Sequence, residues 1–207
     1  MRDRVDQQVR TVVSTPGVPI PSLLRPDDRI VIITLGPGTI EDSLRPPLDQ
    51  TMDEELTEIT TRSSGIFVVE PVKIEARLVE NDERIQTQVT VSVGGVIKDG
   101  ATSLLEPDRT ASFELAGGEL TIKGVVVRAE RNYRFRTHQK YLLALQRLRD
   151  GRVALASMPF LIDGSGRLAP MEFTEGVTGI PQSTLYGESL ETLIGRLSRG
   201  GNDLLDR

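Results

Sequence analysis

Residues Ile66–Val93 read I-F-V-V-E-P-V-K-I-E-A-R-L-V-E-N-D-E-R-I-Q-T-Q-V-T-V-S-V. On both sides of Asn81-Asp82-Glu83, apolar residues alternate with polar ones, a period of two that is typical of β-strands with one buried face. Asn and Asp favour tight turns because their side chains bond to nearby backbone. The stretch therefore predicts a long antiparallel hairpin, bent at Pro71, where the backbone has no N–H to donate.

Shorter strand candidates flank this hairpin. Before it, Ile30–Leu35 is a continuous β-branched run that ends at a Gly-Pro-Gly turn, and after it Gly94-Gly95 suits a bulge. The later candidates are 111–115 joined to 119–128 through 116–118, 140–145 joined to 153–158 through Asp150-Gly151, and 160–162 followed by the Gly-rich turn 163–167. Strands at this spacing, without βαβ alternation, predict a mainly-β fold, either a small barrel or a sandwich.

Helices are expected near both ends of the chain. Leu48–Thr61 has apolar residues at helical spacing and acids in its first turns, and 187–197 has a capping residue, Ser189, before an apolar stripe. Gly200-Gly201-Asn202 is expected to end the second helix. Residues 1–13 predict a short helix or a frayed arm, and the four prolines between 16 and 26 predict an extended linker.

The composition excludes several classes of protein. The chain has 207 residues, of which 38% are hydrophobic and 27% charged, as in globular domains. It has no Cys and one His, His138, which removes thiolate metal sites, His-rich zinc sites and cysteine nucleophiles. No nucleophile-base pair or phosphate-binding loop is present in the sequence. We therefore expect no cofactor, no metal and no enzymatic activity.

No apolar run is long enough for a membrane helix, since Ile30–Leu35 and Gly124–Val127 have only the length of strands. The charged residues at the start of the chain are not followed by the apolar stretch of a signal peptide. The sequence predicts no membrane span. It leaves two locations open, the cytoplasm if the chain is complete and export if its start is truncated.

The order of motifs between 66 and 167 resembles a group of uncharacterised, often exported bacterial proteins. The matching segments are Ile66-Phe67-Val68-Val69, Val91–Gly100, Phe135 ahead of Lys140–Leu145, and Phe160–Arg167. More distantly, this layout is similar to the netrin module and the tissue inhibitors of metalloproteinases. The resemblance implies a closed or partly open OB-like antiparallel barrel over about residues 65–170. It implies no active site, since those inhibitors use an N-terminal Cys that this chain lacks.

On this basis the chain divides into four parts. Residues 1–27 form a flexible, Pro-rich arm, and 28–64 form an extension with a strand and a short helix. Residues 65–170 form the barrel, and 171–207 form a C-terminal segment with an amphipathic helix.

Charge is distributed unevenly along the chain. Residues 122–152 contain nine Lys or Arg against two acids, a net charge of +7, whereas 41–58 contain seven acids against Arg45 alone. Such asymmetry has two interpretations, an anion-binding face or two segments that neutralise each other. The second interpretation is favoured.

The segment around Arg128–Arg136 interleaves aromatic and basic residues. Together with Lys140, it supplies the candidate binding residues Arg128, Arg131, Tyr133, Arg134, Phe135, Arg136 and Lys140. OB barrels bind single-stranded nucleic acid by stacking bases on exposed aromatic rings in a basic groove. Strand alternation, however, turns the rings of Tyr133 and Phe135 to one face and the arginines to the other. The same pattern therefore also fits two rings that fill the barrel interior.

Three other features have structural interpretations that outweigh the functional ones. His138 is expected to be a surface histidine rather than a general base, and Asp163–Gly166 a hairpin turn rather than a calcium loop. The acids at the start of the first predicted helix are expected to complement its N-terminus rather than to bind a cation. They are Asp53, Glu54, Glu55 and Glu58.

The sequence thus favours a non-catalytic binding domain whose partner is a protein. The first alternative is binding of single-stranded nucleic acid or another polyanion through 128–152. The second is a hydrolase that uses carboxylates alone, which requires two acids about 5–10 Å apart in a cleft. A homodimer is also expected to be possible, through the edges of the Ile66–Val93 hairpin or of the Ile30–Leu35 strand.

Overall fold

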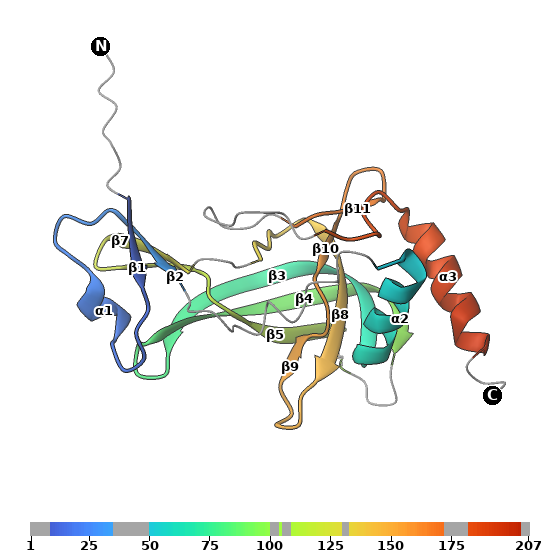
Figure 1. The fold of residues 1–207 in the computed structure, drawn as a ribbon, viewed down its shortest axis with the longest axis horizontal. Helices are drawn as coiled ribbons and strands as arrows, with labels where there is room; N and C mark the ends of the chain where they lie inside the picture. The colour runs from blue at the N-terminus through green and yellow to red at the C-terminus, as the bar shows by residue number, and fades with distance from the viewer. Residues whose placement is uncertain are drawn as a thin grey trace, which may run out of the picture.

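The computed structural model describes residues 9–34, 50–99, 104, 109–129, 133–171 and 182–203. It is mainly β, as predicted, and its strands form two sheets (Figure 1). The larger sheet has the order β11-β10-β8-β3-β4-β5, with β9 also paired to β8, and the smaller has the order β1-β2-β7-β6. All pairings in the larger sheet are antiparallel, whereas β1–β2 and β2–β7 are parallel.

The strands of the larger sheet are β3 (Gly65–Val79), β4 (Arg84–Asp99), β5 (Thr110–Ala116), β8 (Lys140–Arg147), β9 (Val153–Leu155), β10 (Phe160–Ile162) and β11 (Leu168–Ala169). Those of the smaller sheet are β1 (Val9–Val13), β2 (Ile30–Thr34), β6 (Glu119–Ile122) and β7 (Val125–Ala129). The helices are α1 (Ile20–Leu23), α2 (Met52–Arg62) and α3 (Leu190–Asp203).

The predicted hairpin is confirmed as β3 and β4 and extends beyond its predicted ends. Its register shifts at Pro71 and again opposite Gly94-Gly95, where a bend and a bulge were expected. We call residues 65–71 and 91–99 its proximal half, and 72–79 and 84–90 its distal half. β8 pairs with β3 only as far as Val69, so the distal half of β3 has β4 as its one paired strand among the described residues.

The main hydrophobic core surrounds the proximal half and extends as far as Val89 of the distal half. Phe67 of β3 is fully buried and lies opposite Leu143 of β8, which is also fully buried. α2 and α3 lie together at this end of the molecule (Figure 1). The apolar face of α3 packs on this core as predicted, and the backbone N–H of Thr192 donates to Ser189 Oγ at 3.1 Å, which confirms the expected cap.

A second, smaller core joins the distal half to the smaller sheet, at the opposite end of the hairpin from α2 and α3 (Figure 1). Ile85 of β4 packs there with Val31 and Ile33 of β2 and with Val127 of β7. The prediction of one self-contained barrel over 65–170 does not anticipate this arrangement. β6 and β7 lie within that range but pair in the smaller sheet, β7 with β2.

The link between the two sheets is the turn Gly117-Gly118. The sequence predicted that it joins two neighbouring strands, but β5 and β6 belong to different sheets. Thr87 Oγ1 donates to the Gly117 carbonyl at 2.7 Å. Gly118 has φ +136°, and a Cβ there would lie 2.1 Å from Thr87 Oγ1, so this position requires glycine.

Some boundaries predicted for the N-terminal part were wrong. Residues 9–13 form strand β1, because their backbone pairs in parallel with β2, and the Pro-rich stretch contains the helical turn α1 with Pro21 near its start. The 1–27 arm is also attached, since Ile20 N donates to Asp82 O at 2.7 Å. α2 begins at Met52, after a capping box formed by Thr51 and Glu54, and not at Leu48, which lies outside the described residues.

Two later boundaries were also wrong. α3 continues through Gly200-Gly201 to Asp203, and 119–128 is two strands separated by a turn at Lys123-Gly124. A closed barrel is not established, because β5 and β9 lie side by side without any strand pairing between them in the described ranges.

Candidate functional site

The aromatic pair Tyr133 and Phe135 lies inside the molecule. The two residues are 5% and 7% exposed, and both belong to the main core. The Phe135 ring packs edge to face against Phe113 and Tyr141, with centroid separations of 5.7 and 4.9 Å. Of the two interpretations of this segment, the structure therefore agrees with the one in which the two rings fill the interior. Buried rings present no platform on which bases could stack.

Next to these rings is a cleft of about 190 Å³ above the distal half of the hairpin. Its floor is one face of the sheet, because Ile74 lies opposite Val89, and Ala76 lies opposite Thr87, which in turn pairs with Leu115. The other lining residues are Gly118, Glu119, Tyr133, Arg134 and Phe135. Ile74 is 37% exposed, so an apolar side chain stands open to solvent in the cleft.

Two charged residues lie in this lining, and they differ in their contacts. Glu119 Oε2 accepts from Arg128 Nε at 2.5 Å. Arg134 is exposed, and within the described residues its guanidinium makes no hydrogen bond or ion pair. The cleft thus combines an apolar floor with one cation that is available to an incoming group.

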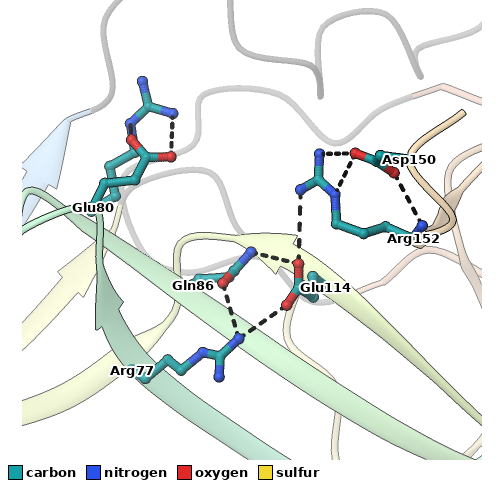
Figure 2. Close-up of polar contacts among 7 residues, drawn as sticks. Arg77, Glu80, Gln86, Glu114, Asp150 and Arg152 are labelled. Carbon is teal, nitrogen blue, oxygen red and sulfur yellow. Dashed lines mark hydrogen bonds and ion pairs between the residues drawn. The ribbon is translucent and has the colours of Figure 1, made fainter. Parts of the chain in front are cut away.

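The opposite face of the hairpin is polar (Figure 2). Glu114 of β5 accepts from Arg77 Nη2 at 3.0 Å and from Gln86 Nε2 at 2.8 Å. Arg152 Nη1 lies 3.9 Å from Glu114 and Arg152 Nη2 lies 2.7 Å from Asp150. Hydrogen bonds from the Arg152 backbone and side chain lower the pKa of Asp150. The side chains of Arg77 and Arg152 are 55% and 60% exposed, so these are solvated ion pairs.

The structure separates the predicted candidate residues into groups. Tyr133, Arg134 and Phe135 line the cleft. Arg136 and Lys140 are exposed but are not part of its lining, and the Arg136 backbone N–H donates to the Tyr141 hydroxyl at 2.9 Å. Arg128 is paired with Glu119, and Arg131 lies outside the described residues.

Sequence reasoning missed the residues that form the floor of the cleft. Alternation correctly puts Ile74 and Ala76 on the face that also carries Val89, but it cannot indicate where the cover of that face stops. The residues that bound the open part of that face, Gly118, Glu119 and 133–135, come from distant parts of the chain.

The acids of α2 pair elsewhere than with the basic segment, and the other acids of segment 41–58, which are Glu41, Asp42 and Asp49, lie outside the described residues. Asp53 bonds to Arg196 of α3 at 2.9 Å, and Glu58 bonds to Arg62 of its own helix at 2.9 Å. Glu54 accepts from the Thr51 backbone N–H at 2.8 Å, which lowers the pKa of this carboxyl and confirms that it complements the helix N-terminus. Within the described chain, no three potential metal ligands gather into a cation site.

Glu55, the remaining acid, is buried and holds the segment before α3. It accepts from Ser183 Oγ at 2.6 Å, from Thr184 N at 2.8 Å and from Thr184 Oγ1 at 2.6 Å. Burial, and then the nearby Glu55 charge, raise the pKa of Tyr186 to about 12. Three donors satisfy this carboxylate, so its contacts are those of a structural group.

Two smaller predictions concern turns and surface residues. The His138 side chain is 90% exposed, with Nδ1 3.5 Å from Glu70, as expected of a surface histidine. Asp163 Oδ1 accepts from Ser165 N, Ser165 Oγ and Arg167 N at 2.7–3.0 Å, which is the expected turn.

Among the helices in the described ranges, none has the length and apolarity needed to cross a bilayer. Comparison of the chain with protein-family models, with curated proteins and with solved structures finds no match.

Proposed function

We propose that this chain is a non-catalytic binding domain that recognises a protein partner through the cleft beside Tyr133, Arg134 and Phe135. The observation that carries the proposal is the open apolar floor. Ile74 remains 37% exposed in a cleft whose floor also contains Val89 and Leu115, which are 0% and 6% exposed. A partner that inserts an apolar side chain would remove this remaining surface from water, which favours association.

The size of the cleft supports a protein rather than a free small molecule. Its volume of about 190 Å³ is below the roughly 300–1,000 Å³ typical of ligand pockets. One or two aliphatic side chains would fill it. Arg134 in its lining favours a partner that carries an acidic residue close to this apolar anchor.

The unpaired edge of β3 supports an extended partner segment. β8 stops at Val69, so the edge of β3 beyond this residue has no second strand in the described chain. An added strand could bond to this backbone and direct alternate side chains toward Ile74, as in recognition by strand addition.

The two alternatives have weaker support. Polyanion binding is less well supported because Arg128 and Arg152 are paired with acids and both aromatic residues are buried, which leaves Arg134, Arg136 and Lys140 as exposed cations without a stacking platform beside them. A carboxylate-only hydrolase requires two acids in one cleft, but the lining of this cleft contains only Glu119, which is paired with Arg128. Three acids line a shallow hollow on α2, and each of them is already bonded, Asp53 to Arg196, Glu54 to Thr51 and Glu58 to Arg62.

We also infer that the larger sheet is an open form of the OB-like barrel implied by the resemblance to the netrin module and the exported bacterial proteins. Two observations support this inference. β5 and β9 lie side by side, and the ion pair between Glu114 and Arg152 spans the space between them.

The test is selection from a random peptide library displayed on phage, followed by affinity measurements on synthetic peptides. We expect peptides that combine an aliphatic residue with a nearby acid. Ile74→Asp should weaken their binding at least tenfold, and Val96→Asp, at a similarly exposed position of β4 outside the cleft, should not. Arg134→Glu should weaken binding of acidic peptides and improve binding of the same peptides with Lys in place of the acid.

Three outcomes would contradict the proposal. They are a selection that yields no peptide, equal binding by Ile74→Asp, and tight, salt-sensitive binding to heparin or to a fluorescent single-stranded oligonucleotide. The last result would transfer the function to the basic segment.

A further inference from the structure

Strand β1 forms one edge of the smaller sheet, and its outer backbone groups are unpaired in the described residues. Ser14 N donates to Thr34 O at 3.1 Å, and Val12 O accepts from Thr34 Oγ1 at 3.3 Å. The backbone groups of even-numbered residues therefore face β2. Because these directions alternate along a strand, the N–H and C=O groups of Val9, Thr11 and Val13 point away from the sheet.

Within the described residues, the outward side chains of this edge carry no charge. Val9 and Val13 are 54% and 67% exposed, and Thr11 is exposed between them. The one charged residue of β1, Arg10, is turned inward, where Nε and Nη2 donate to Asp28 at 2.8 and 2.6 Å. Edge strands of monomeric proteins are usually blocked by outward charges, prolines or bulges, and β1 has none of these.

We propose that β1 is the contact between two copies of this chain, paired antiparallel about a two-fold axis at Thr11. The exposed residues read Val-x-Thr-x-Val, a pattern that is the same in both directions. Antiparallel pairing about Thr11 puts Val9 opposite Val13 of the second copy and the two Thr11 residues opposite each other. These residues are also the ones whose backbone groups point outward, so backbone bonding and side-chain pairing require the same register.

This geometry makes a second copy a better occupant than an unrelated strand. A self-complementary surface pairs with itself without any further matching, as in two-fold interfaces generally. The inward position of Arg10 also prevents like charges from meeting at the contact. β6, which lines the cleft through Glu119, is the opposite edge of the sheet, so a dimer at β1 leaves the cleft open.

The contact is small. Five residues per strand bury less than the roughly 1,200 Å² found in stable interfaces, so the dimer should depend on concentration. Sedimentation velocity from micromolar to near-millimolar protein should detect a reversible monomer–dimer equilibrium.

Charge variants at the two-fold axis test the register. T11K alone and T11E alone should each weaken association about tenfold or more, because like charges would face each other across the axis. An equimolar mixture of T11K and T11E should associate again, because a Lys would then face a Glu. The matched control is T121K, which makes the same change at an exposed Thr on β6, the other edge strand, and should behave as the native chain.

Far-ultraviolet circular dichroism and the midpoint of thermal unfolding should be the same for all four proteins. The proposal is overturned if the native chain is monomeric throughout, if T11K associates as well as the native chain, or if mixing the two variants restores nothing. None of these results bears on the cleft, whose peptides are tested separately.

Discussion

The two halves of the β3–β4 hairpin are held in different ways. The proximal half lies within a core that includes Phe67, Phe113, Tyr141 and Phe160, with β8 on one side and two helices nearby. The second core, which joins the distal half to the smaller sheet, contains no aromatic residue, and polar contacts accompany it, such as Arg10–Asp28. Burial of large side chains therefore stabilises the proximal end of the hairpin, whereas a smaller apolar core and polar contacts together stabilise the distal end. The cleft lies between these two cores.

The largest effect is expected in the proximal half. Phe67→Ala should lower the free energy of unfolding by roughly 3–5 kcal/mol, because it removes a fully buried ring from close-packed surroundings. Urea denaturation followed by circular dichroism measures this change. The matched position is Val72, which is 54% exposed on the same strand, and Val72→Ala should change stability by about 0.5 kcal/mol or less. Similar costs at both positions would contradict the contrast between the two halves.

A smaller and more local effect is expected from Asp28→Asn. Asp28 is buried and accepts from Arg10 and from the Arg25 backbone N–H, so loss of its charge should cost roughly 1–3 kcal/mol. Hydrogen exchange should increase in β1, β2 and β7 and stay unchanged in β8. The exposed neighbour provides the control, and Asp27→Asn should leave exchange as it is.

The stability that the Arg10–Asp28 ion pair contributes should depend on pH. The hydrogen bonds from Arg10 and then from the Arg25 backbone outweigh burial and lower the pKa of Asp28 from 3.8 to about 2. A depressed pKa contributes stability that is complete above 3.8 and is lost as the pH falls toward about 2. The difference in stability between the native chain and Asp28→Asn should therefore shrink across that range. A constant difference would show that the charge of Asp28 contributes nothing.

The smallest effect is expected on the polar face of the hairpin. Glu114→Gln removes the carboxylate shared by Arg77 and Arg152 (Figure 2), yet these arginines are more than half exposed, so the cost should be below about 1 kcal/mol. Thermal unfolding at low and high salt should show that the difference shrinks as salt screens the ion pairs. A loss of more than about 2 kcal/mol would mean that this ion pair is a main tie between β5 and β9.

Local patterns predicted the elements whose partners are close in sequence. The β3–β4 hairpin, the β10–β11 hairpin and the apolar stripe of α3 follow from the alternation, turn residues and helical spacing of their own segments. The pairing of strands that are distant in sequence was missed, because a strand's own residues do not identify its partner. Nothing in Ile30–Thr34 indicates that it pairs with β7, and β1 resembles a loose arm unless its parallel partner is known.

The candidate site was predicted in part for the same reason. The alternation of Tyr133 and Phe135 with arginines indicated that the two rings share one face, which the structure puts inside. The cleft depends on where Gly118, Glu119 and residues 133–135 meet the face of the hairpin, and this is a property of the assembled fold.

Because β2 pairs with β7, the smaller sheet cannot be completed until β7 has been synthesised. Ile30 pairs with Val126, about 100 residues later in the chain, so β2 leaves the ribosome well before the strand that completes its sheet. At roughly 5–20 residues per second, the wait is about 5–20 seconds. During that time Val31 and Ile33, both buried in the finished fold, lack their final cover. The smaller sheet is therefore a part of this protein whose apolar side chains depend on being shielded, for example by chaperones, until β7 has been synthesised.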